Sequence, residues 1–197
     1  MNKQNREVTK TDLMSLEEYS KNRTSIRKDI VNYKKNRRVP IGPYANFYFE
    51  SFKTMKAQIQ EMLYIEKGGE EQLKDELAAY NPLIPKGEEL VATLMFEIDN
   101  SILRTEFLNK IGGIEEYVYI LVGGKKIIAT PEKDLDRTSA EGKASSVQFL
   151  HFNFSKEDIK NFKKKELEVV VGINHKFYSH ITKISNDTRE ALIEDFI

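Results

Sequence analysis

The order of sequence patterns along the chain is the feature that most constrains its fold. Up to Tyr80, most apolar residues recur at helical spacing, as Ile26, Ile30 and Tyr33 do. Beyond that residue the pattern changes to alternation of apolar and polar positions, best developed from Leu90 to Ile98. Helices followed by strands predict an α+β protein with an antiparallel sheet, because parallel strands need crossover helices between them.

Local signals predict where the elements begin and end. Ser15–Glu18 has the pattern of a capping box, so we expect a short helix to start there and a second helix to run from about Ser25 to Asn36. Alternation from Val39 to Glu50 predicts a strand, which Gly42 and Pro43 interrupt. Further helices are expected near residues 54–67, 70–80, 101–110 and 187–196, with a short helix capped by residues 155–158. Further strands are expected near 90–98, 117–122, 125–130, 146–154, 167–173 and 177–184.

These elements predict one architecture. N-terminal helices pack on a mostly antiparallel sheet, as a sandwich or a partly open barrel, and a C-terminal helix completes the fold. We expect residues 1–10 to form a disordered tail, residues 11–197 a single domain, and the polar residues 131–145 a loop. Gly123 and Gly124 predict a tight hairpin turn with positive φ at both positions.

Composition excludes several classes of function. Lys plus Arg equals Asp plus Glu at 31 each, so no overall field draws the chain to nucleic acid or an anionic membrane. Cysteine is absent, which removes disulfides, thiolate metal sites and cysteine nucleophiles. The chain has no apolar run long enough for an export signal or a membrane span, so we expect a cytoplasmic protein without membrane contact.

A basic stretch from Lys21 to Arg38 is the strongest charge feature. It holds eight basic residues against one acid, Asp29, a local net charge of +7. Such a cluster suits a phosphate or nucleic-acid contact, with Arg37 and Arg38 as the pair best placed to hold an anion. The alternative is a solvated helix face that the acidic stretch 61–76 neutralises, and the lack of interleaved aromatic residues or a reading motif argues against nucleic acid.

The histidines offer a second kind of site. His175 and His180 lie close in sequence, with Tyr178 between them and His151 on an earlier strand. Imidazole and phenolate are ligands for iron, zinc or haem, so these four residues form a candidate metal or haem site. Their spacing fits no standard metal motif, and hydrogen-bonded histidines at a sheet surface are the alternative.

Catalytic patterns are weak elsewhere in the sequence. The glycine pairs lack the strand, spaced glycines and helix start of a phosphate-binding loop. The carboxylates are scattered over predicted helix faces, and no nucleophile with a neighbouring base can be identified. These features favour a protein that is not an enzyme.

Several segments in the same order resemble a known bacterial family. They are Leu13–Tyr19, Lys35–Val39 with Gly42-Pro43, Gln58–Leu63, Glu76–Pro85, Ala92–Leu94, Ser146–Leu150 and Asp187–Arg189. Together they resemble the family called domain of unknown function 3501, over nearly the whole chain. The resemblance implies no assigned activity. At position 176 it leads us to expect proline, where this chain has Lys176.

The resemblance also implies a setting, because members are often encoded beside rubrerythrin-like proteins and iron–sulfur oxidoreductases. Three hypotheses follow. The first is an accessory module that docks on a redox or peroxide-stress protein; the second is an iron- or haem-binding protein; the third is an anion or nucleic-acid binder that uses the basic stretch. The frequency of symmetric dimers leaves a homodimer open.

Overall fold

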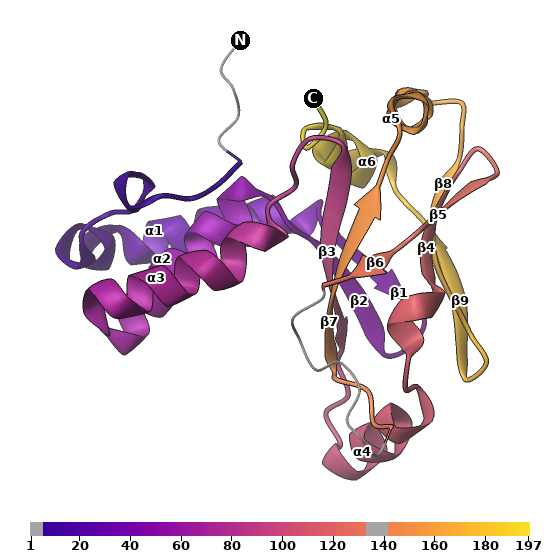
Figure 1. The fold of residues 1–197 in the computed structure, drawn as a ribbon, viewed down its shortest axis with the longest axis horizontal. Coiled ribbons are helices and arrows are strands. Elements are labelled where there is room, and N and C mark those ends of the chain that lie inside the picture. Colours follow the sequence, from indigo (N-terminus) through magenta and orange to yellow (C-terminus); the bar gives the residue numbers. More distant parts are fainter. Residues whose placement is uncertain (1–5, 133–141) are drawn as a thin grey trace.

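The computed structural model describes residues 6–132 and 142–197. Two antiparallel sheets face one another, and a group of helices projects to one side from the outer face of one sheet (Figure 1). This arrangement confirms the α+β class and the antiparallel sheet. Within the described residues, no helix is both long and apolar enough to cross a membrane.

The helices fall into an N-terminal group and shorter helices at the ends of the sheets (Figure 1). They are α1 (Leu16–Lys35), α2 (Phe52–Glu66), α3 (Gly69–Tyr80), α4 (Ser101–Lys110), α5 (Lys156–Lys163) and α6 (Asn186–Ile193), with the 3-10 turns η1 (Lys10–Asp12), η2 (Asn81–Leu83) and η3 (Ile114–Tyr117). Both α1 and α3 pack on α2, which lies between them. We call α1, α2 and α3 the helical arm.

The strands form two sheets of different size. They are β1 (Arg38–Ile41), β2 (Ala45–Phe49), β3 (Glu89–Phe96), β4 (Val118–Val122), β5 (Lys125–Ile128), β6 (Thr130–Pro131), β7 (Val147–Asn153), β8 (Val169–His175) and β9 (Tyr178–Lys183). The first sheet has the order β1-β2-β3-β7-β6 and the second the order β5-β4-β8-β9. All pairings are antiparallel, as in Val91 opposite His151 and Ile120 opposite Val171.

Two apolar clusters explain why the layers stay together. The larger one fills the space between the sheets, with Phe47, Leu94 and Phe152 from the first sheet and Ile120 and Val171 from the second. A smaller cluster joins the outer face of the first sheet to the arm, through contacts that include Met55, Ile59 and Val91. The first sheet is therefore covered on both faces.

The edges of the two sheets meet at β1 and β9. The Tyr178 hydroxyl donates to the Ile41 carbonyl oxygen at 2.6 Å, and the Thr182 hydroxyl donates to the Pro40 carbonyl oxygen at 2.8 Å. Gly42, in the turn after β1, has φ +62°, and a Cβ there would lie 2.5 Å from His180 Cδ2. Glycine is needed at this turn for both reasons.

The structure differs from the sequence prediction in the first helix. Two helices were expected before Asn36, but α1 is one continuous helix that begins after its N-cap, Ser15. No glycine or proline lies between Leu16 and Lys35, and the polar residues in the middle cost only tenths of a kcal/mol each. The Asn22 amide donates to the Glu18 carbonyl within the helix at 3.0 Å, so this polar residue does not interrupt it.

The N-terminal segment also differs from the expected tail. Val8 is buried, and its backbone amide donates to the Asn81 side chain at 2.7 Å. The Arg6 guanidinium donates to the Pro85 carbonyl at 2.9 Å. Residues 6–10 are thus attached to the fold, whereas residues 1–5 of the expected tail and residues 133–141 of the expected loop lie outside the described residues.

Candidate functional site

The basic stretch lies on α1, a helix of 20 residues of which only Tyr19 is fully buried. Its partly buried residues face α2, at the helical spacing of Arg23, Ile26 and Ile30. The opposite side is exposed over its length. It carries Lys21, Thr24, Lys28, Val31 and Lys35, a set that we call the outward stripe.

The acidic stretch 61–76 does not neutralise this stripe. Among the described residues, the ion pair that joins the two stretches is Arg23 with Glu61, on the side of α1 that faces α2. Lys21 pairs with Glu17 on its own helix at 2.7 Å, and no described carboxylate lies within 4 Å of Lys28 or Lys35. The remaining acids lie mostly on α3, beyond α2.

Arg37 is buried rather than displayed. It is 1% exposed, and its guanidinium makes two hydrogen bonds of 2.8 and 3.0 Å to the carboxylate of Asp195. It also donates to the carbonyls of Glu50 and Ala191, and it stacks over the Tyr33 ring at 5.0 Å. Since these partners surround the guanidinium, Arg37 ties the C-terminus to the start of β1 and offers no surface to an external anion.

Arg38 is exposed but engaged. Its guanidinium donates to Asn46 at 3.0 Å and to Glu97 at 3.1 Å. Glu97 also accepts from the Tyr48 hydroxyl at 2.6 Å, and burial together with this bond raises the pKa of Tyr48 to about 12. The two arginines therefore point to different partners and do not form a joint anion site.

His151 lies between two carboxylates on the first sheet. Its Nδ1 is 2.9 Å from Glu89, and its Nε2 is 2.8 Å from Glu132. Burial lowers the pKa of His151, but the hydrogen bonds and charges of both glutamates outweigh this effect and raise it. An imidazolium that bridges two carboxylates has no nitrogen left for a metal ion.

Tyr178 and His180 lie together on β9. Their ring centroids are 4.5 Å apart, and Tyr178 also packs against Tyr44, Phe96 and Phe107. The Tyr178 hydroxyl bonds to the backbone of the turn after β1, and burial raises its pKa. The phenol is therefore neutral at pH 7 and links the two sheets.

His175 belongs to a different group of side chains, at the end of β8. Its ring packs edge-on against Tyr117, with centroids 5.1 Å apart, and its Nδ1 accepts the Phe177 backbone amide at 3.3 Å. Burial and the charge of Lys176 lower the pKa of His175. The neutral ring therefore carries its proton on Nε2.

The structure does not bring together the four residues of the predicted metal or haem site. His151 is on the first sheet, whereas His175, Tyr178 and His180 are on the second. There His175 packs against Tyr117, and the rings of Tyr178 and His180 pack against each other. A metal ion on His175 Nε2 would require a proton on Nδ1, where the ring already accepts an N–H. Across residues 6–132 and 142–197, no three His, Asp or Glu side chains are arranged to hold a metal ion.

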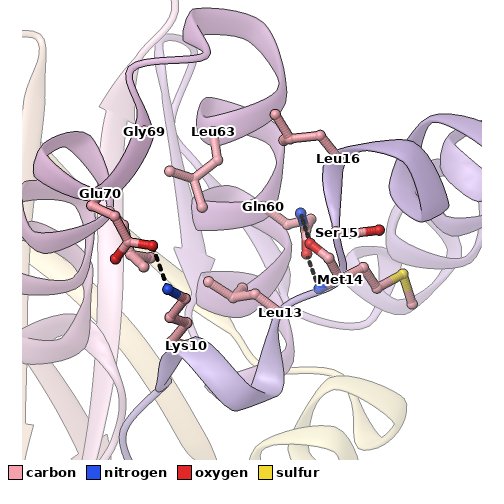
Figure 2. Close-up of a pocket in the computed structure, with 10 residues that line it drawn as sticks. Lys10, Leu13, Met14, Ser15, Leu16, Gln60, Leu63, Gly69 and Glu70 are labelled. Carbon is pink, nitrogen blue, oxygen red and sulfur yellow. Dashed lines mark hydrogen bonds and ion pairs between the residues drawn. The ribbon is translucent and has the colours of Figure 1, made fainter.

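A groove of about 310 Å³ lies between the N-terminal segment and the helices α2 and α3 (Figure 2). The Gln60 side chain accepts from the Met14 amide at 2.7 Å and donates to the Met14 carbonyl at 3.2 Å, while Lys10 pairs with Glu70. Leu13 and Leu63 form apolar walls. The contacts attach the N-terminal segment to the arm, so we read the groove as structural.

Fold and surfaces together define a two-sheet α+β protein with a projecting helical arm and a basic helix exposed on it. The chain belongs to the family described as protein of unknown function (DUF3501), whose model matches residues 7–196. This confirms the resemblance. Its fold is similar to a crystal structure of a novel protein of unknown function from Burkholderia pseudomallei, with 33% identity, a TM-score of 0.89 and coverage of 96% of this chain and 99% of that one. No curated protein matches the chain.

Sequence reasoning missed the partners that decide these sites. Asp195 lies 158 residues from Arg37, and Glu89 lies 62 residues from His151. No local pattern connects such positions. For the group around His175 the sequence does carry a local signal, because Lys176 stands where the resemblance leads us to expect proline.

Proposed function

We propose that this protein is a binding module that docks an acidic partner protein through the outward stripe of α1. The observation that carries the proposal is a long helix with one side against α2 and an exposed side that carries three lysines, with Glu17 paired to Lys21 at its N-terminal end. A helix of this length normally buries an apolar face against the core of the protein, whereas α1 has one fully buried residue. Most of its surface is therefore free to contact a partner protein.

The spacing of the stripe suggests the form of the partner surface. Lys21, Lys28 and Lys35 recur every seven residues, which places them about 10.5 Å apart along the helix axis. An acidic helix with carboxylates at the same interval can face all three. Thr24 and Val31 lie between the lysines, and Val31 is 61% exposed. Between Lys28 and Lys35, it offers an apolar contact from which an interface can exclude water.

The family setting supports one class of partner. The resemblance associates members with rubrerythrin-like and iron–sulfur oxidoreductase proteins, so a redox protein with an acidic surface is the partner that we propose. The charges would steer the encounter and set its salt dependence. The module itself would supply no catalytic group at this surface, where the residues are lysine, threonine and valine.

Fluorescence anisotropy with a defined probe tests the proposal. The probe is a labelled helical peptide with glutamates at seven-residue intervals, and the variant is K21Q/K28Q/K35Q. The matched control is K156Q/K160Q/K163Q, which removes three exposed lysines from α5. We expect the stripe variant to bind about tenfold more weakly, because each exposed pair contributes up to about 0.5 kcal/mol, and the control to bind as wild type.

Two outcomes would overturn the proposal. Equal loss in both triple variants would mean that the peptide senses net charge only. Tighter binding of a 20-base-pair DNA or a short single-stranded RNA than of the peptide, with a steep fall as salt rises, would assign the stripe to nucleic acid instead.

A further inference from the structure

A second site lies far from the arm, at the hairpin end of β8 and β9. A pocket of about 460 Å³ opens there, between the turn after α4 and the end of the hairpin. Its lining residues are Gly112, Tyr117, Asn174, His175, Lys176 and Ser179. They come from segments more than 50 residues apart in sequence, 112–117 and 174–179, so the fold brings them together.

His175 supplies this pocket with a buried polar side chain. The residue is 5% exposed, and its Nδ1 is occupied by the Phe177 amide. Nε2 therefore carries the ring proton, and no described residue accepts it. The Nε2 atom is not enclosed by the protein, so a ligand in the pocket that the ring lines can reach it.

The other lining side chains complement that donor. Lys176 carries a positive charge and lies over the Phe177 ring at 4.8 Å. Asn174 and Ser179 also line the pocket and are paired with each other, since the Ser179 hydroxyl donates to Asn174 Oδ1 at 3.4 Å. None of the described lining residues is acidic. A cation would therefore meet an N–H group and a like charge, whereas the oxygens of an oxyanion would accept from His175 Nε2–H and from the Lys176 ammonium.

The pocket also has an aromatic wall. The Tyr117 ring lines it, packs on His175 and remains 48% exposed. An exposed ring next to anion donors suits a ligand with a flat apolar body behind its charged head. We propose that this pocket binds a small aromatic oxyanion, with His175 Nε2–H and the Lys176 ammonium holding the carboxylate or phosphate head.

The test uses benzoate and phenyl phosphate as probes, with benzamide as the neutral analogue of benzoate. Titrations are followed at low salt by the nitrogen and proton NMR signals of the His175 ring and of the amides of residues 174–179. We expect both anions to shift these signals in a saturable manner and benzamide to shift them much less. Saturation at a lower concentration with one of the two anions identifies a carboxylate or a phosphate as the preferred head group.

Two lysine variants make the result specific. Lys176, in the turn between β8 and β9, and Lys126, on β5, are both exposed. Each lies over an aromatic ring, and the Lys126 ammonium is 4.1 Å from the Tyr119 centroid. We expect K176Q to weaken benzoate binding about tenfold, as loss of one charge-assisted contact does, and K126Q to leave it unchanged. Neither change touches a buried group, so both variants should fold.

Three results would overturn the inference. They are no saturable shift of the His175 signals with either anion, equal shifts with benzoate and benzamide, or the same loss of binding in K176Q and K126Q. The first would remove the site, the second would reduce it to an aromatic contact, and the third would reduce it to general charge attraction.

Discussion

At the scale of single residues, the pair Arg37 and Asp195 shows how a charge that looks functional becomes structural. The two side chains are 1% and 9% exposed, and they join the start of β1 to the C-terminus. The sequence indicates the local charge of Arg37 correctly. It cannot show the burial, because the partner comes from the other end of the chain.

This pair gives a stability prediction. Arg37→Met leaves the Asp195 carboxylate buried without its partner, and we expect the free energy of unfolding to fall by about 3–5 kcal/mol. Arg38→Met is the control, because it breaks an exposed pair with Glu97 and should cost no more than about 1 kcal/mol. Urea unfolding of both variants measures the difference. Equal costs would mean that Arg37 is not held as described.

His151 gives a prediction about pH. Because the pKa of His151 is raised in the folded state, its contribution is complete below the unfolded pKa of about 6.5 and is lost as pH rises through the folded value. His175 has a lowered pKa, so its contribution to stability changes with pH in the opposite direction. The contribution of His151 is therefore measured by comparing the wild type with a His151 variant.

The comparison is between wild type and His151→Gln, by urea unfolding at about pH 5.5 and about pH 8.5. We expect the wild type to exceed the variant in stability by more at the lower pH, where the imidazolium bridges Glu89 and Glu132. A larger difference at the higher pH would contradict the raised pKa.

At the scale of elements, the sequence predicts starts and turns well because these depend on neighbouring residues. The Ser15 hydroxyl accepts the Glu18 amide, as the capping pattern indicates, and Gly123 and Gly124 have φ of 54° and 91° in the turn between β4 and β5. The prediction fails inside α1, where two helices were expected and one continuous helix forms. Packing on α2 outweighs small differences in helix propensity.

The N-cap of α1 can be tested directly. Ser15→Ala removes the side chain that accepts the Glu18 amide, and we expect a loss of about 1 kcal/mol in the free energy of unfolding. Ser25→Ala is the control, since Ser25 is exposed in the middle of the same helix and alanine is the better helix former. Thermal or urea unfolding decides, and a stabilising effect of Ser15→Ala would contradict the cap.

At the scale of the whole molecule, the sequence predicts the class of fold but not how the strands divide between two sheets. That division depends on contacts such as Tyr178 with Ile41, between segments 137 residues apart. The candidate sites follow the same rule. The basic helix is visible in the sequence, whereas its exposed side, the burial of Arg37 and the pocket around His175 exist only once the layers have packed.

The central claim is that the exposed side of α1 meets an acidic partner, and photo-crosslinking in living cells tests it most directly. A photoreactive amino acid replaces Thr24, between Lys21 and Lys28 on the outward stripe, and in a control chain it replaces the exposed Glu157 on α5. We predict a crosslink to an acidic protein from position 24 alone, lost in K21Q/K28Q/K35Q and kept in K156Q/K160Q/K163Q. No crosslink from position 24, or one that survives removal of the three stripe lysines, would contradict the proposed docking surface.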